Sequence, residues 1–441
     1  MSRRRRRRLP EFPHPLRVEA LADDGQGVSR YGEREVRIAG ALPGETVRVT
    51  ARRRRNGYVQ CMSTEFEHRV ADRVEPFCPH ALICGGCTLQ HLQHDAQLRH
   101  KARCLTRALE AFDVMPTRVL APVVGPLRGY RRKARLGVRL VPKKGGVLVG
   151  FRETGSSLVT ATEICPVLVP AVGERIGLLR ELISGLSTSG KIPQIEVAAG
   201  DDDAAIVIRH LEALSAADRA RLQSFSEDTS LHVYLQSGGP DCVHKLAPDD
   251  AHERLEYRLS ESGVSLRFHP LDFVQVNACV NEAMVAQALA LLELEPGEHV
   301  ADLFCGIGNF SLPMAAAGAH VVGVEGSPEL VARARENCVH NSLSDADFIT
   351  ADLYQDELPA SVKELEIRKL VLDPPRSGAL HVVTQLALGG IERIVYVSCN
   401  RDTFARDARV LVDRGFELEA VGVLDMFPHT GHVESMGLFR R

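Results

Sequence analysis

The chain has 441 residues, of which 44% are hydrophobic and 25% charged, and its net charge is -3. These values are ordinary for a globular protein of two or three domains, and with no run of about 18 apolar residues a membrane-spanning helix is not expected. The charged N-terminus has no apolar stretch behind it, which argues against a secretory signal and predicts a cytoplasmic protein.

The charge is distributed unevenly along the chain. Residues 1–60 carry a local balance of +8 and the remainder one of -11, and the densest basic runs are Arg3–Arg8 and Arg52–Arg55. A basic N-terminal segment in an otherwise mildly acidic chain indicates a protein that binds a polyanion through its N-terminal region. For the tail at residues 1–13, a solvated, disordered arm is an equally good interpretation.

Residues 14–70 alternate short β-prone stretches with glycine turns, which is typical of a small, OB-like β-barrel. One such turn is Leu42-Pro43-Gly44-Glu45. Basic strands that also carry tyrosine suit the binding of RNA. The expected strands include Glu35–Ile38, Thr46–Thr50 and Tyr58–Met62.

Residues 71–270 read as a mixed α/β central region that opens with a group of cysteines. Cys78, Cys84 and Cys87 cluster around two glycines, and Cys165 follows much later. Reduced thiols are expected in a cytosolic chain. Three clustered thiolates with a remote fourth favour an iron–sulfur cluster, although four cysteines also satisfy tetrahedral zinc. Six other cysteines show no ligand spacing and are interpreted as structural: Cys61, Cys104, Cys242, Cys279, Cys305 and Cys338.

Within the central region a helix is expected from about Leu92 to Phe112, with strands at Ala134–Leu140 and Ala204–Ile208. Residues 271–441 differ, because from Glu298 onward apolar strands alternate with glycine turns and helices. This alternation predicts an α/β fold with a parallel, doubly wound sheet. Its expected strands are Val300–Leu303, His320–Val324, Asp347–Ile349, Lys369–Leu372 and Ile394–Ser398, with one or two more between Glu417 and the C-terminus.

The first of these strands runs into a Gly306-x-Gly308 turn that carries Phe304 and Asn309. The glycines let the backbone turn tightly and approach a ligand closely. Glu325 ends the second strand, where an acid binds a ribose diol, and Asp352 follows the third, where it can meet an adenine. The pattern predicts a nucleotide-like cofactor, with S-adenosylmethionine favoured over a dinucleotide.

Two further strands are followed by residues with reactive or acidic side chains that are candidates for catalysis. Asp373 begins an Asp-Pro-Pro-Arg loop after the fourth strand, and Cys399 follows the fifth. Ligands of open α/β sheets lie beyond the carboxyl ends of the strands, so Cys399 is a candidate nucleophile with Asp373 as a fixed acceptor beside it. Glu434 is a candidate general base, and His429 and His432 are rivals for that role.

These motifs together resemble those of the bacterial RNA uracil-C5 methyltransferases, and most closely the members that act on 23S ribosomal RNA. The resemblance spans nearly the whole chain. The motifs that carry it are Cys78-x5-Cys84-Gly-Gly-Cys87, Phe273-Val-Gln275-Val-Asn277, Asp302-Leu-Phe304-Cys-Gly306-x-Gly308-Asn309, Asp373-Pro-Pro-Arg376, Ser398-Cys399-Asn400 and His429-Thr-x-His432-Val-Glu434.

The resemblance implies a class I, Rossmann-like methyltransferase domain and a TRAM barrel that binds RNA. Nothing in the sequence suggests more than a monomer. The resemblance also implies that S-adenosylmethionine is the cofactor of the reaction, that 23S ribosomal RNA is the partner, and that Cys399 is the nucleophile and Glu434 the base for methylation of one uridine. The donor-binding residues that it implies are Gln275, Phe304, Asn309, Glu325, Asp352 and Asp373. The ligands of a [4Fe–4S] cluster that it implies are Cys78, Cys84, Cys87 and Cys165.

The chain departs from the family pattern at Arg401, where proline usually follows Ser-Cys-Asn. An extra cation there is expected to favour the thiolate or to touch RNA phosphate. Alternatives in the same family act on transfer RNA or on another 23S uridine, but the relatives of these types lack the barrel, and the transfer-RNA type also lacks the cluster. Outside the family, the competing hypotheses are an NAD-linked oxidoreductase and a non-catalytic RNA-binding assembly factor.

Overall fold

A computed structural model describes residues 9–441, except 56, 250–251, 356 and 364–365. The Arg3–Arg8 run therefore lies outside the described residues. The chain divides into two compact units. Unit 1 comprises residues 1–103, 152–160 and 428–432, and unit 2 comprises residues 104–151, 161–427 and 433–441. Among the described residues, no helix is both long and apolar enough to cross a bilayer.

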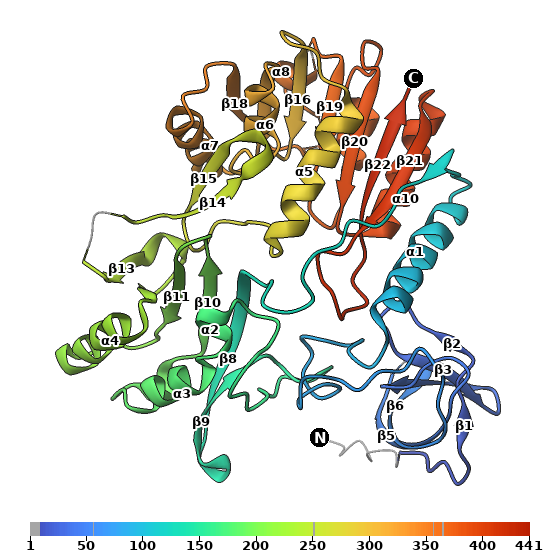
Figure 1. Cartoon of the computed structure of the whole chain (residues 1–441), viewed down its shortest axis with the longest axis vertical. Coiled ribbons are helices and arrows are strands. Elements are labelled where there is room, and N and C mark those ends of the chain that lie inside the picture. The colour runs from blue at the N-terminus through green and yellow to red at the C-terminus, as the bar shows by residue number, and fades with distance from the viewer. Residues whose placement is uncertain (1–8, 56, 250–251, 356, 364–365) are drawn as a thin grey trace, which may run out of the picture. The chain divides into compact units, whose positions relative to one another are not determined.

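Unit 1 contains a six-stranded, mostly antiparallel sheet with the order β1-β5-β6-β4-β3-β2, in which β4 and β6 are parallel. Alternate residues such as Val36, Ile38, Val47 and Val59 are buried in its core. The strands curl around this core, as Figure 1 shows in blue. They are β1 (Leu16–Arg17), β2 (Ala20–Leu21), β3 (Gly27–Tyr31), β4 (Arg34–Ala39), β5 (Thr46–Arg54) and β6 (Tyr58–His68). Helix α1 (His94–Glu110) begins in unit 1 and ends in unit 2.

The first part of unit 2 is a second six-stranded sheet, with the order β13-β12-β11-β10-β8-β9. Its strands are β8 (Lys133–Val141), β9 (Gly146–Gly150), β10 (Gln194–Ala199), β11 (Ala204–Arg209), β12 (His232–Gln236) and β13 (Val243–Ala247). Its helices are α2 (Pro170–Gly173), α3 (Ile176–Ser184) and α4 (Ala216–Thr229). A hairpin of β14 (Leu255–Leu259) and β15 (Val264–Phe268) follows.

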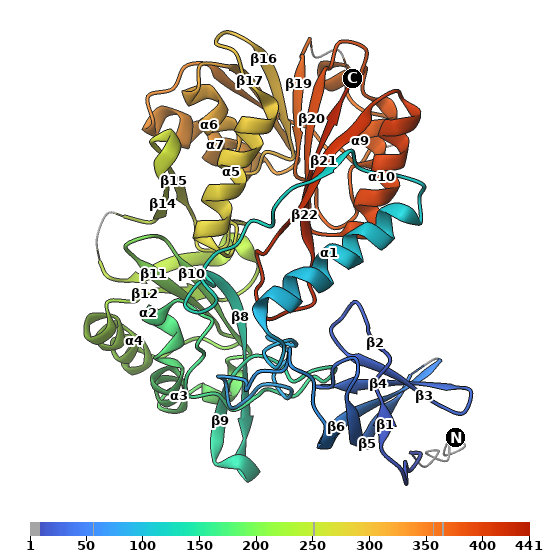
Figure 2. The ribbon, with the colours of Figure 1, turned by 45° about the vertical axis from the view of Figure 1, so that its right-hand side comes forward.

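The remainder of unit 2 is built on an eight-stranded sheet with the order β18-β17-β16-β19-β20-β22-β21-β7. The strands are β7 (Arg118–Val119), β16 (His299–Leu303), β17 (His320–Glu325), β18 (Ala346–Thr350), β19 (Lys369–Leu372), β20 (Arg393–Ser398), β21 (Glu417–Leu424) and β22 (Glu434–Arg440). The helices are α5 (Ala278–Leu292), α6 (Ser311–Ala316), α7 (Pro328–His340), α8 (Ala360–Lys363), α9 (Leu380–Gln385) and α10 (Arg401–Asp413). Figures 1 and 2 show α5 crossing one face of this sheet.

The sequence explains why the central strands of the eight-stranded sheet are buried. β19 and β20 are almost continuous runs of buried Leu, Val and Ile, as expected for parallel strands covered on both faces. Helix starts are marked by side-chain caps: Asn277 accepts from the Val280 amide at α5, and Asn400 accepts from the Asp402 amide at α10.

The expectation of a parallel sheet is correct for β16 to β20 and wrong for the last strand. β22 lies between β20 and β21 and runs antiparallel to both, which makes the sheet mixed. The apolar character of β22 is the same in either direction, so composition alone does not distinguish the two arrangements.

Candidate functional site

The carboxyl ends of the central strands meet at one edge of the eight-stranded sheet. Leu303 pairs with Leu372, and Leu372 pairs with Tyr396 across parallel ladders. The residues that leave β16, β19 and β20 therefore emerge at the same edge, as is usual for the ligand sites of open α/β sheets. These residues include Phe304, Asp373 and Cys399.

The turn after β16 adopts the left-handed backbone that the glycines favour, with φ of +55° at Gly306 and +95° at Gly308. Phe304 shares this conformation at φ +68°, which is uncommon for an aromatic residue. Glu325 is held against the turn, because its two carboxylate oxygens accept from the amides of Gly306 at 3.2 Å and Ser327 at 2.9 Å. The structure thus brings together the predicted glycine turn and the predicted ribose-binding acid.

Asp302 lies beneath this turn and is fully buried. Its Oδ2 accepts from Ser311 Oγ at 2.5 Å, while its Oδ1 has no partner among the residues that the structure describes. Burial raises the pKa of Asp302 to about 7, against the opposing hydrogen bonds from Ser311 and with help from Glu325. The sequence identifies Asp302 only as part of a motif and does not reveal its unpaired oxygen.

Two other predicted donor-binding residues are already engaged within unit 2. Asn309 exchanges hydrogen bonds with Asn281 at 2.9 and 3.0 Å and accepts from the Tyr257 hydroxyl at 2.8 Å, so α5 and the β14–β15 hairpin fix its amide. Gln275 Nε2 donates to Asp373 Oδ2 at 3.3 Å. This contact joins the segment before α5 to the predicted catalytic loop.

Asp352 is exposed on the loop after β18, where its Oδ1 accepts from the Tyr354 amide at 2.9 Å. Sequence reasoning missed Tyr354. Its ring centroid lies 5.6 Å from that of Phe304, and its hydroxyl contacts the loop after β19. An aromatic residue two positions beyond a predicted ligand acid was the available signal.

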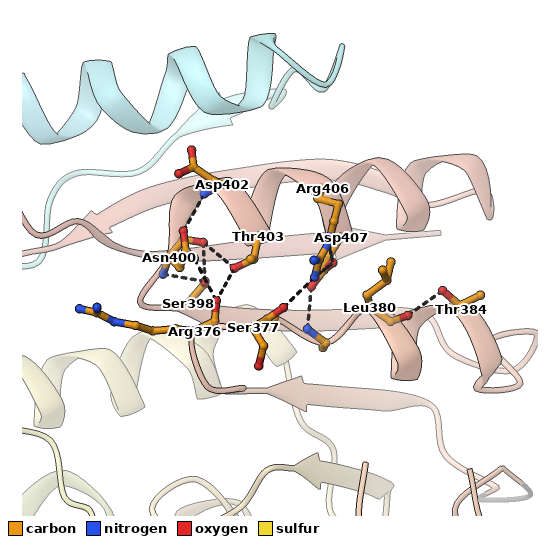
Figure 3. Close-up of polar contacts among 12 residues, drawn as sticks. Arg376, Ser377, Leu380, Thr384, Ser398, Asn400, Asp402, Thr403, Arg406 and Asp407 are labelled. Carbon is orange, nitrogen blue, oxygen red and sulfur yellow. Dashed lines mark hydrogen bonds and ion pairs between the residues drawn. The ribbon is translucent and has the colours of Figure 1, made fainter. Parts of the chain in front are cut away.

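The loop from Asp373 to Gly378 is clamped by side chains of α10 and of the turn before it (Figure 3). Asn400 Nδ2 and Thr403 Oγ1 donate to the Arg376 carbonyl at 2.9 and 3.2 Å. Arg406 Nη2 donates to the Ser377 carbonyl at 2.9 Å. Bonds to successive carbonyls leave this backbone little freedom, so the positions of Asp373 and Arg376 are fixed by the fold.

The strands that lead to the predicted nucleophile and base are neighbours in the sheet. In the antiparallel ladder of β20 and β22, Ser398 pairs with Ser435. Cys399 follows the last residue of β20 and Glu434 is the first residue of β22, and the charge of Glu434 acts on the Cys399 thiol, so the two side chains lie near one another. Glu434 is buried and Cys399 is half-buried.

The thiol and two carboxyl groups influence one another electrostatically. Burial raises the pKa of Cys399 to about 11, and the charges of Glu434 and Asp373 add to the rise while Arg376 opposes it. Burial also raises the pKa of Asp373 well above its usual range, reinforced by Glu434 and Asp302 and opposed by the hydrogen bond from Gln275. The cation that lowers the pKa of Cys399 is therefore Arg376, whereas Arg401 forms an ion pair with Asp402 at 3.6 Å.

The rival histidines belong to unit 1. The His429 amide donates to Gln97 Oε1 at 2.8 Å, its ring meets that of Phe77 edge-on at 5.0 Å, and its carbonyl accepts from the amides of Thr88 and Leu89. His429 thus packs inside unit 1 and connects residues 428–432 to the segment that contains Thr88 and Gln97. His432 is half-buried in the same segment.

The predicted cluster ligands are distributed over both units, with Cys165 in unit 2 and the other three in unit 1. The structure joins none of the described cysteines by a disulfide. The Gly86 amide donates to Cys84 Sγ at 3.4 Å, a contact typical of a thiolate ligand. Among the described residues, no three His, Cys, Asp or Glu side chains are arranged so that they could hold a metal ion.

A family model described as tRNA (Uracil-5-)-methyltransferase matches residues 206–441. The chain is 47% identical over 443 residues to the 23S rRNA (uracil(1939)-C(5))-methyltransferase RlmD of Hahella chejuensis, covering 99% of each chain. It is 49% identical over 440 residues to the RlmD of Alkalilimnicola ehrlichii, again covering 99% of each.

Among solved structures, the chain resembles the tRNA (uracil-54, C5)-methyltransferase of Pyrococcus abyssi in complex with S-adenosyl-L-homocysteine. The TM-score is 0.73 at 24% identity, with 96% of this chain and 100% of that chain covered. This likeness shows that the two chains share a fold. With the family match and the full-length relatives, it leads to one conclusion: the chain belongs to the tRNA (Uracil-5-)-methyltransferase family of RNA uracil-C5 methyltransferases.

Proposed function

We propose that this enzyme transfers a methyl group from S-adenosylmethionine to carbon 5 of one uridine in 23S ribosomal RNA. The position numbered 1939 in the names of its full-length relatives is the proposed target. The observation that carries the proposal is that Cys399 lies within electrostatic reach of Glu434 and Asp373 at one edge of the sheet. A ribosomal RNA substrate implies work in the cytoplasm, and we propose that the enzyme acts as a monomer.

The proposed donor site is the turn after β16. Glu325, oriented by the Gly306 and Ser327 amides, is suited to accept hydrogen bonds from a ribose diol. Phe304 supplies an apolar wall, and Asp352 is proposed to meet the adenine. Gln275 and Asn309 complete the donor-binding set. Bound S-adenosylmethionine supplies an electrophilic methyl group.

The proposed reaction uses three side chains of this chain. The Cys399 thiolate adds to carbon 6 of the uracil, which makes carbon 5 an enolate-type nucleophile that attacks the methyl group. Glu434 then takes the proton from carbon 5, and the sulfur leaves carbon 6 as the ring double bond re-forms. Asp373, which accepts a hydrogen bond from Gln275, is proposed to bind the imide N–H of the uracil.

A fluorinated substrate tests this mechanism. In RNA that carries 5-fluorouridine at the target, fluorine cannot leave as a proton does, so the enzyme should remain covalently attached after methyl transfer. Cys399→Ala should abolish both the adduct and methylation, while affinity for S-adenosylhomocysteine stays within about twofold. Cys279→Ala, at an exposed thiol, is the matched control and should behave as wild type. Failure of the wild type to form an adduct would rule out the mechanism.

The RNA target is tested in cells. Mapping of methylated uridines in ribosomal RNA and transfer RNA from a strain that lacks the protein should show the loss of one 23S site. Loss of a transfer-RNA site instead would show that the substrate assignment is wrong while the chemistry is right.

For the accessory parts, we propose that residues 14–70 form a TRAM-like barrel that binds RNA, that residues 71–270 form a central domain, and that residues 271–441 form the methyltransferase domain. We also propose a [4Fe–4S] cluster on Cys78, Cys84, Cys87 and Cys165. The donor set of four thiols and the Gly86 amide bond to Cys84 support it.

The cluster proposal predicts a brown protein with visible charge-transfer absorption. Cys84→Ser should bleach this absorption and release iron, whereas Cys242→Ser, at an exposed cysteine without ligand spacing, should change neither. A colourless protein that contains zinc would contradict the assignment.

A further inference from the structure

Tyr354 occupies a place between the donor turn and the catalytic loop that none of the recognised motifs includes. It is half-buried on the loop that follows β18, and its amide is tied to Asp352 at 2.9 Å. Its ring lies against that of Phe304 with 5.6 Å between centroids and a tilt of 46°. Aromatic pairs at this separation attract beyond simple burial, so the ring braces the proposed donor-binding turn.

The hydroxyl of Tyr354 makes two hydrogen bonds to the loop after β19. It donates to the Gly378 carbonyl at 2.9 Å and accepts from Ser377 Oγ at 2.9 Å. Burial raises the pKa of Tyr354, so the phenol keeps the proton that it donates. Asn400, Thr403 and Arg406, from α10 and the turn before it, donate to the carbonyls of Arg376 and Ser377 (Figure 3). The loop after β19 is thus held by hydrogen bonds from two parts of the fold. One part is α10 with the turn before it, and the other is Tyr354 on the loop after β18.

We propose that Tyr354 is a positioning residue for methyl transfer, whose ring braces the donor turn while its hydroxyl fixes the loop that carries Asp373 and Arg376. This inference rests on the proposed function. One side chain then keeps the methyl donor aligned with the groups that act on Cys399. Alignment matters because a displacement of about 1 Å at a reacting centre can cost roughly 100-fold in rate.

Tyr354→Phe tests the inference, because it keeps the ring and removes only the hydroxyl. We expect kcat and the rate of adduct formation with 5-fluorouridine RNA to fall about 10-fold or more. The KM for RNA and the Kd for S-adenosylhomocysteine should stay within about twofold. Tyr354→Leu also removes the ring and should weaken binding of S-adenosylhomocysteine in addition.

Tyr234→Phe is the matched control, because it removes a buried hydroxyl that donates to the Glu253 carbonyl at 3.1 Å, far along the chain from the site residues. Its kcat should equal that of the wild type. An unchanged kcat in Tyr354→Phe would overturn the inference, and so would an equal fall in both Phe variants, which would indicate a general loss of rigidity. If the wild type itself neither methylates RNA nor forms an adduct, the proposed function fails and the inference fails with it.

Discussion

At the scale of single residues, the Cys399 thiol is protonated at neutral pH in the protein alone, because its surroundings raise its pKa and oppose a negative charge. Burial comes first among the causes, followed by Glu434 and Asp373. A thiol that is protonated at neutral pH is protected from oxidation and from other electrophiles, since the thiolate is the reactive form. In the proposed mechanism, RNA binding therefore has to favour the thiolate.

This electrostatic balance predicts opposite effects from two substitutions. Because the charge of Glu434 raises the pKa of Cys399, Glu434→Gln should lower it and speed alkylation by iodoacetamide at pH values between 9 and about 11. Arg376→Gln removes the opposing cation and should slow alkylation in the same range. Mass spectrometry of the Cys399 peptide measures both rates, and each unit of pKa changes the thiolate fraction about tenfold. Shifts in the same direction would contradict this account.

Sequence reasoning reached the residues with distinctive chemistry and missed those that act through contacts. Asp373, Cys399 and Glu434 stand in motifs that the sequence alone shows. Tyr354 belongs to no motif, because its significance comes from lying within reach of both Phe304 and Gly378. Such proximity depends on tertiary packing, which local sequence does not encode.

At the scale of elements, the loop after β19 depends on a glycine that no other residue can replace without strain. Gly378 has φ +80°, and a Cβ there would lie 2.5 Å from Asp407 Oδ2 and 2.7 Å from Arg406 Nη2. Asp407 cannot readily move, because its Oδ2 also accepts from the Ala379 amide and the Tyr396 hydroxyl, both at 2.7 Å. Backbone geometry and a buried carboxylate thus define the loop together.

Gly378→Ala should therefore destabilise the protein by about 1–3 kcal/mol through backbone strain, and it should lower methyltransferase activity by shifting Asp373. Gly389→Ala is the control, since a Cβ at Gly389 meets no other atom within 4 Å. Thermal unfolding midpoints of the two variants, measured together with their activities, give the comparison. Equal midpoints would show that the loop adjusts without cost.

Most strands can be predicted within one or two residues, because apolar runs bounded by glycine turns are strong local signals. β16, β19 and β20 are examples. The antiparallel insertion of β22 cannot be predicted in this way, because the order and direction of strands arise from the packing of distant segments. That insertion places the start of β22, with Glu434, beside the end of β20 that leads to Cys399, so an arrangement important for the proposed chemistry is hard to predict from the sequence.

At the scale of the whole molecule, the basic N-terminal residues predict salt-dependent binding of RNA. Deleting Arg3–Arg8 should lower the slope of log affinity against log salt by about 0.7–0.9 for each phosphate that the tail no longer neutralises. Replacing the same arginines by lysine keeps the charge and should leave the slope nearly unchanged. Filter binding at several salt concentrations measures it, and an unaltered slope after deletion would show that the tail does not bind the RNA.

The two units are not consecutive in the sequence. The chain passes between them five times, and unit 1 includes residues 152–160 and 428–432. The His429 carbonyl, which receives the Thr88 and Leu89 amides, belongs to one of these distant segments. Recombination that exchanged only residues 1–103 with a relative would therefore transplant an incomplete body. A chimaera that exchanges unit 1 with that of a relative therefore has to replace residues 1–103, 152–160 and 428–432 together.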